Sequence, residues 1–193
     1  MTKTQEKILT ASRDLFLARG YPATTIDEIV EKAGVSKGSF YHAFPSKEEM
    51  GLVLLEWYQL GGVDRLMSGP FSSEKDPLKR MFGFLDHIEN ISKDMWGHGC
   101  LLGNLGLELA ESSPKIRQKV SHLFQNVLNL LEPIFEPAGR SPERQNHPTA
   151  REIAEHYLII FEGAIMMALV YKDWGYFSKG LNGFRDHLKF LTA

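Results

Sequence analysis

The feature that most constrains this chain is an interruption of the helical pattern at Gly34. A segment with apolar residues at helical spacing ends there, and glycine readily adopts the left-handed conformation that terminates a helix. Ser36 follows at the position of an N-cap, where its hydroxyl can accept the backbone N–H of Ser39. Val35 and Phe40 occupy the two positions of a hydrophobic staple around that cap. The pattern predicts a helix, a tight turn and a second helix of only about two turns.

The exposed face of this second helix carries hydrogen-bonding groups without a carboxylate, namely Lys37, Ser39, Tyr41 and His42. No Asp or Glu lies between Glu31 and Glu48. Gly38 has no side chain, so the start of the helix can come close to an anion. Short polar, basic and aromatic groups at a helix start suit the DNA backbone and major groove. We interpret the helix as a DNA-binding element, and the alternative is a solvated helix in an ordinary bundle.

A longer pattern surrounds this turn and comprises Thr24–Ile26, Ile29, Ala33–His42, Phe44 and Ser46–Glu48. On these residues, the segment 8–50 resembles the N-terminal domain of the TetR family of transcriptional regulators. The resemblance implies an all-α protein of about nine helices. A helix-turn-helix domain would occupy residues 1–47, a linking helix residues 46–66, and a helical effector-binding and dimerisation domain residues 67–193.

The resemblance also implies which residues contact DNA: Thr25, Lys37, Gly38, Ser39, Tyr41, His42 and Lys47. We expect Lys37 and Ser39 to reach base edges, and the other residues of the second helix and Lys47 to hold phosphates. Thr25 also begins a helix, and Glu28 completes a capping box with it. The Thr25 hydroxyl could therefore cap this helix or contact a phosphate.

Charge restricts how DNA could be bound. The chain has 193 residues, a formal net charge of −2 and 43% hydrophobic residues, which suits one large or two small domains. Its first 50 residues contain seven Lys and Arg against seven Asp and Glu. DNA affinity must therefore come from the local placement of charge and not from a bulk excess.

Capping and turn signals divide the rest of the chain into helices. Asp76-Pro77 and Ser113-Pro114 are typical helix starts, and polar loops are expected at 68–74 and 137–148. The fifth helix should bury a stripe that comprises Leu78, Met81, Phe82, Leu85, Ile88 and Ile91. No stretch favours a strand, so the fold class is all-α.

The segment from Tyr157 to Tyr171 is apolar on nearly every side, which indicates burial on more than one face. A partner chain could cover the second face, and the alternative is a deeply buried helix of a monomer. We expect a homodimer, since dimeric helix-turn-helix proteins read palindromic sites. The predicted interface comprises Tyr157, Ile160, Gly163, Ala164, Met167, Ala168, Tyr171, Phe184 and Leu188.

A regulator of this kind needs a ligand that favours one conformation. Cys100, Asn104 and Glu108 recur every four residues and share a helix face among leucines, as suits a largely apolar pocket with a few polar groups. The predicted effector pocket comprises Phe82, Leu85, Met95, Trp96, Cys100, Leu101, Asn104, Leu105, Glu108, Phe124, Tyr157 and Phe161. The alternative is that the polar stripe faces solvent or the linking helix.

Cys100 has two interpretations. Its surroundings resemble those in a TetR subgroup of NemR-like regulators, which implies a thiol that senses reactive compounds, and a thiolate at a helix start is reactive. The more common case is a buried cysteine that acts as a small hydrophobe. A metal site is not expected, because nothing near His98 and Cys100 completes a set of ligands.

The sequence predicts a ligand-responsive repressor that binds palindromic operator DNA as a dimer and is released by a small molecule. A single Cys and no recognised signal or membrane-spanning segment indicate the cytoplasm. No catalytic residues and no cofactor are expected. The alternatives are an activator of the same family, a helical protein–protein interaction module, and an enzyme that uses Cys100.

Overall fold

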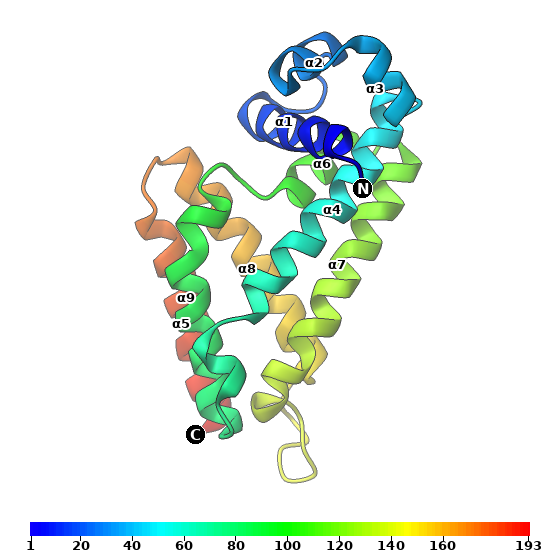
Figure 1. Ribbon diagram of the computed structural model, residues 1–193. Helices are drawn as coiled ribbons and strands as arrows, with labels where there is room; N and C mark the ends of the chain where they lie inside the picture. The colour runs from blue at the N-terminus through cyan, green and yellow to red at the C-terminus, as the bar shows by residue number, and fades with distance from the viewer. The chain divides into compact units, whose positions relative to one another are not determined.

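The computed structural model describes residues 1–193 and contains nine α-helices, two short 3-10 segments and no β-strand (Figure 1). The all-α prediction is therefore confirmed. The helices are α1 (Lys3–Arg19), α2 (Ile26–Ala33), α3 (Lys37–Ala43), α4 (Lys47–Met67), α5 (Pro77–Trp96), α6 (Leu101–Leu109), α7 (Pro114–Phe135), α8 (Ala150–Val170) and α9 (Gly175–Thr192). The 3-10 segments are η1 (Pro70–Ser73) and η2 (Glu136–Ala138).

The chain forms two compact units. The first consists of Met1–Gly61 and Cys100–Leu123, and the second of Gly62–Gly99 and Phe124–Ala193. In this division α6 and the first half of α7 group with α1, α2 and α3, and the predicted domain boundary at residue 67 stays a prediction. Both α4 and α7 contribute residues to each unit.

Local capping explains how the helices of the first unit begin and end. Thr25 and Glu28 form the predicted capping box at the start of α2. Gly34 has φ 64° and ψ 41°, the left-handed conformation that ends α2. Ser36 then caps α3 by accepting the Ser39 N–H at 3.1 Å. These local signals were all predicted correctly from the sequence.

The core of the first unit is apolar and includes fully buried aromatic rings. Ile8, Leu9, Phe16, Ile29, Phe40, Phe44, Met50, Leu54 and Leu55 are buried there. Phe40 contacts Phe44 with ring centroids 6.0 Å apart, so the short α3 is anchored by its inner face. The opposite face of α3 remains exposed and can contact a partner.

In the second unit, α5 begins as predicted, because Asp76 Oδ1 accepts the N–H groups of Leu78 and Lys79. The predicted stripe on α5 is partly wrong. Phe84 is fully buried, whereas Phe82 is half-buried and Leu78 is exposed. The buried residues of α5 are Met81, Phe84, Leu85, Ile88, Ser92 and Trp96, a stripe at helical spacing that includes Phe84 instead of Phe82.

Helices α8 and α9 lie side by side in the second unit (Figure 1). A Cβ added at Gly180 would lie 3.0 Å from the Ala164 Cβ, so glycine permits this close crossing. By length and composition α8 could also cross a membrane, with a mean hydropathy of 1.7 in its most apolar window. Core helices of soluble proteins have the same character, and Ile153, Tyr157 and Ile165 of α8 are buried within the chain.

Candidate functional site

The exposed face of α3 carries the predicted DNA-contacting groups. Lys37, Gly38, Tyr41 and His42 are exposed, and Ser39 is half-buried. The Ser39 hydroxyl lies 2.9 Å from the Ser36 hydroxyl, but a hydroxyl can donate one bond and accept others. The Tyr41 ring is half exposed and packs edge-on against the buried Phe40 ring. Side chains at the start of α3 are therefore available to an external partner.

Lys37 forms an ion pair with Asp27 of α2 at 2.7 Å. The hydrogen bond and the charge of Asp27 raise the pKa of Lys37. Both side chains are more than half exposed, so the pair is weak in water. Lys37 can therefore exchange Asp27 for a phosphate or a base edge at little cost.

Thr25 is engaged in its own cap. Its hydroxyl accepts the Glu28 N–H at 3.3 Å and donates to Glu28 Oε2 at 2.9 Å. The Thr25 backbone N–H also donates to Glu28 Oε2, at 2.8 Å. This backbone bond first, and the bond from the hydroxyl second, lower the pKa of Glu28. Arg19 pairs with the same carboxylate at 2.9 Å. The capping role of Thr25 is confirmed, and a phosphate contact by Thr25 stays a prediction.

The Lys47 side chain packs against Tyr21, and its predicted phosphate contact stays a prediction. Its Nζ donates to the Tyr21 carbonyl oxygen at 2.5 Å and lies 4.0 Å from the Tyr21 ring centroid. Burial lowers the pKa of Lys47. The ammonium group therefore points toward the end of α1, where a hydrogen bond to the Tyr21 carbonyl and a cation–π contact with the Tyr21 ring hold it.

The start of α1 adds residues that sequence reasoning missed. A surface hollow of about 570 Å³ is lined by Thr2, Thr4, Gln5, Ser36, Gly38, Ser39, His42 and Ala43. Thr2 and Gln5 also form a capping box at the start of α1. That capping box was the only available signal, and it does not show that α1 and α3 share a hollow.

Polar contacts join α6 and α7 to α4 and to Tyr21, just after α1, within the first unit. The Tyr21 N–H donates to Glu108 Oε2 at 2.7 Å, and the Ser113 hydroxyl donates to Glu48 Oε1 at 2.5 Å. Further contacts join Lys115 to Glu49, Lys119 to Glu56, and the Gln59 amide to the Leu123 carbonyl. Movement of α6 or of this part of α7 would therefore pull directly on α1 and α4.

These contacts change the predicted effector pocket. Glu108 is exposed and its carboxylate binds the Tyr21 amide, so its predicted role in a pocket wall is wrong. In the first unit, Cys100, Leu101 and Leu105 are buried and Asn104 is half-buried. Burial of Cys100 agrees with the hydrophobic interpretation of this thiol. The polar stripe was misread because sequence periodicity does not show which neighbour a carboxylate faces.

The other seven predicted pocket residues fall in the second unit. Leu85, Trp96, Tyr157 and Phe161 are buried there, while Phe82, Met95 and Phe124 are half-buried. The Trp96 and Phe161 rings meet edge to face at 4.7 Å, and Tyr157 lies 5.8 Å from Phe161. The structure thus brings three of the predicted aromatic residues into one cluster.

The predicted dimer interface also needs correction. Tyr157, Ala164, Ala168, Phe184 and Leu188 are buried within the chain itself, so their side chains have no surface to offer a partner. Ile160, Gly163 and Met167 are half-buried, and Tyr171 is exposed. The apolar residues that do face outward are Ile159 (71% exposed), Met166, Leu169 and Val170 (70%) on α8, and Phe190 (79%) on α9.

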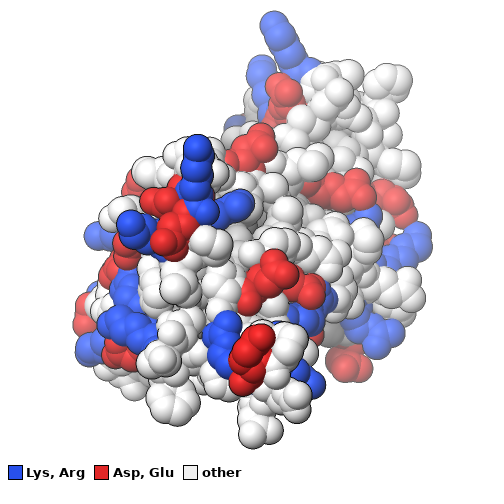
Figure 2. Space-filling view, turned by 90° about the horizontal axis from the view of Figure 1, so that it is seen from below, with Lys and Arg blue, Asp and Glu red and all other residues white.

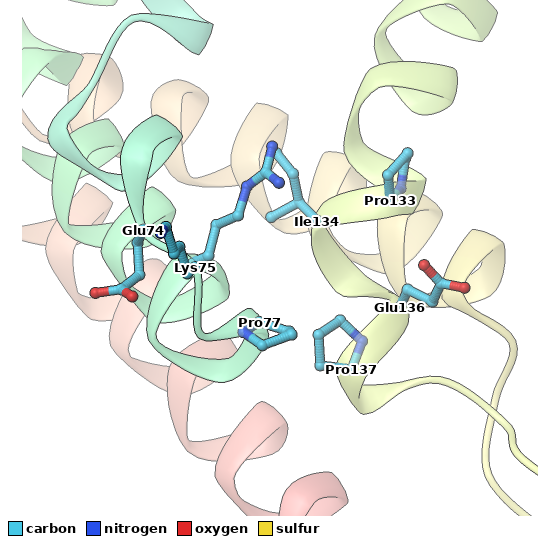
Figure 3. A pocket seen from close by; sticks show the side chains of 8 residues that line it. Glu74, Lys75, Pro77, Pro133, Ile134, Glu136 and Pro137 are labelled. Atoms are coloured by element: carbon cyan, nitrogen blue, oxygen red, sulfur yellow. The ribbon is translucent and has the colours of Figure 1, made fainter.

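Two other surface features are less suited to function. A hollow of about 480 Å³ lies between the start of α5 and the end of α7, where Pro77 and Pro137 face one another (Figure 3). Glu74 and Glu136 point away from it (Figure 3). On the face shown in Figure 2, acidic and basic side chains are interspersed, without a large basic patch.

An N-terminal helix-turn-helix and a second helical unit define a two-part, DNA-binding regulator. Residues 8–52 match the bacterial regulatory proteins of the tetR family, and residues 77–179 match the C-terminal domain of LmrA/YxaF-like transcriptional regulators. The chain belongs to the TetR family of bacterial transcriptional regulators.

Named relatives and solved structures agree with this assignment. The chain is 30% identical to the repressor NemR of Escherichia coli, over 75% of this chain and 70% of that protein. It is 29% identical to the regulator AcuR of Cereibacter sphaeroides, over 84% and 75% of the two chains. Reduced E. coli NemR superposes with a TM-score of 0.80 at 26% identity and covers 96% of both chains. A TetR regulatory protein of Rhodobacter sphaeroides gives a TM-score of 0.82 at 25% identity, over 96% and 99% of the chains.

Proposed function

We propose that this protein is a cytoplasmic, homodimeric repressor that binds a palindromic operator and is released by a small molecule. The observation that carries the proposal is the face of α3, whose polar and basic groups are exposed while Phe40 anchors its other side. The names of two relatives, the repressors NemR and DhaR, support repression over activation.

DNA contact would begin at the start of α3. Exchange of Asp27 for DNA would free Lys37, and the Ser39 hydroxyl could turn from Ser36 to a base edge. Tyr41, His42 and the Gly38 amide would hold phosphates. Lys47 braces the end of α1 through Tyr21, and a phosphate contact by Lys47 would require exchange of that hydrogen bond.

Dimerisation would use the outward stripe on α8 and α9. Ile159, Met166 and Val170 recur at helical spacing on α8, and Phe190 is exposed on α9. A Cβ added at Gly163 or at Gly183 would meet no atom within 4 Å, so both glycines leave room for a second helix to approach. A two-fold dimer would pair this stripe with the same stripe of a second copy.

Release would require the effector to change how the DNA-binding helices are held. Glu108 of α6 binds the Tyr21 amide, and Ser113 binds Glu48 of α4. A shift of α6 would break or strain these bonds and alter the angle between α1 and α4. Because α4 and α7 contribute to both units, they provide a covalent route from the second unit to the first.

The test compares two hydroxyl deletions on an operator obtained by selection. Tyr41→Phe should weaken binding to operator and random duplexes equally, by about tenfold or more, because a hydrogen bond to a charged phosphate contributes about 1.5–3 kcal/mol. Ser39→Ala should lower the ratio of operator to random binding. Ser141→Ala, in the loop after η2, is the matched control and should change neither. Equal loss on both duplexes for Ser39→Ala would refute base reading by Ser39.

A further inference from the structure

The hydroxyl group of Tyr157 on α8 is buried without a hydrogen-bond partner. The residue is 3% exposed, so water does not satisfy the group from the surface. A buried, unsatisfied hydroxyl typically costs about 1–3 kcal/mol. Phenylalanine would fill the same space without this cost. An unsatisfied donor in a core is therefore a place where a ligand could supply the missing acceptor.

Four aromatic rings from α5, α7, α8 and α9 lie around Tyr157. Its ring lies 5.3 Å from Phe184, 5.5 Å from Phe135, and 5.8 Å from both Phe84 and Phe161. The hydroxyl is thus the only unsatisfied polar group in a cluster built from four helices. Such a lining favours flat, apolar molecules over polar ones.

No buried charge in this unit could balance an ionic ligand. Ser92 is the unit's one buried small polar residue, and its hydroxyl already donates to the Glu89 carbonyl and accepts the Trp174 ring N–H. Burial, and then the negative charge of Glu162, raise the pKa of Tyr157, so the phenol stays protonated and remains a donor. The same negative charge and the apolar lining disfavour an anion.

We propose that the aromatic cluster around Tyr157 is the effector site, and that it takes an uncharged, aromatic molecule with one hydrogen-bond acceptor that receives the Tyr157 hydroxyl. This inference rests on the proposed ligand-responsive function and names the chemical class of the ligand. The ligand would enter beside Trp96 and Phe161, which are 7% and 8% exposed and meet at the edge of the cluster. Entry would separate these two rings and so displace α5 from α8.

The experiment titrates the full-length protein with three probes of similar size and follows binding by protein NMR. Acetophenone carries a carbonyl acceptor, ethylbenzene lacks it, and benzoate carries a charge. Acetophenone should bind wild type about five- to tenfold more tightly than ethylbenzene, the worth of one hydrogen bond. Tyr157→Phe should remove this difference, and benzoate should not bind.

Tyr176→Phe is the matched control, because the half-buried Tyr176 ring stacks on Tyr171 outside the cluster. It should leave all three affinities unchanged. Tyr157→Phe should also raise the melting temperature of the ligand-free protein, since it removes the unsatisfied hydroxyl. A lower melting temperature would show that the hydroxyl has a partner in solution and would overturn the inference. Equal affinities for acetophenone and ethylbenzene, or no binding of either, would also overturn it.

Operator binding separates this inference from the proposed function. If wild type binds no specific duplex, the proposed function fails, whatever the probes do. If the operator is bound and acetophenone is recognised through Tyr157, acetophenone should weaken operator binding in wild type and have less effect in Tyr157→Phe. Recognition of acetophenone without any change in operator binding would overturn the assignment of this cluster as the effector site.

Discussion

Replacing Ile159 with alanine should weaken the dimer of this protein without unfolding it. Ile159 is 71% exposed on the outward stripe of α8, so most of its side chain is available to a partner. The substitution removes three carbons at about 0.8 kcal/mol each, which gives about 1.7 kcal/mol per protomer after allowing for the part already buried. In a two-fold dimer both protomers carry the substitution, so the loss is about 3.4 kcal/mol per dimer.

This loss corresponds to an increase of about 300-fold in the dimer dissociation constant. Alanine has a higher helix propensity than isoleucine, so α8 itself should not be weakened. Leu107→Ala is the matched control, since Leu107 is an aliphatic residue of equal carbon number, 87% exposed on α6 and outside the stripe.

Sedimentation equilibrium over a dilution series measures both dissociation constants. Ile159→Ala should dissociate at concentrations where wild type and Leu107→Ala remain dimeric. A monomeric wild type, an unchanged constant for Ile159→Ala, or an equal effect of the two substitutions would refute the assignment of the dimer surface to this stripe.

Three further predictions concern the fold. Gly34→Ala should destabilise the protein by about 1–2 kcal/mol in denaturant unfolding, because φ is 64° there, whereas Gly38→Ala, in ordinary helix, should not destabilise it. Thr25→Val keeps the shape but loses the cap, and should cost about 1 kcal/mol in the same assay. The pKa of His187 is lowered by burial and, to a smaller extent, by the neighbouring His156. The unfolded chain therefore takes up this proton at a higher pH than the folded chain does. The free energy of unfolding should fall as the pH drops below about 6.5. His187→Gln should flatten that part of the pH profile of unfolding free energy; an unchanged profile would contradict this origin.

Features set by neighbouring residues could be predicted from the sequence. The Thr25 capping box, the turn at Gly34 and the Ser36 cap depend on residues at most three positions apart, and all are present in the structure. The exposed face of α3 followed from the same local reasoning, because Phe40 is the one large apolar residue that the short helix could bury in mid-span.

Features set by tertiary packing could not be predicted in this way. Phe82 and Phe84 are two positions apart on α5, and only the neighbouring elements decide which of them faces the core. Apolar residues occur on nearly every side of α8, so their periodicity does not show which face is buried. It could not distinguish the buried Tyr157 from the exposed Ile159. The partner of Glu108 is a backbone amide 87 positions away in the sequence, and local residue spacing cannot indicate such a contact. Glu108 was therefore assigned to a pocket.

The most direct test of the account is selection of bound duplexes from a random library by wild-type protein, at two salt concentrations. We expect an enriched palindrome whose half-sites lie about one helical turn, or a small multiple of it, apart, as a dimeric helix-turn-helix reader requires. Specific binding should weaken with salt while the enriched sequence stays the same. Salt-sensitive binding with no enriched sequence, or no binding at all, would contradict the central claim that α3 reads an operator.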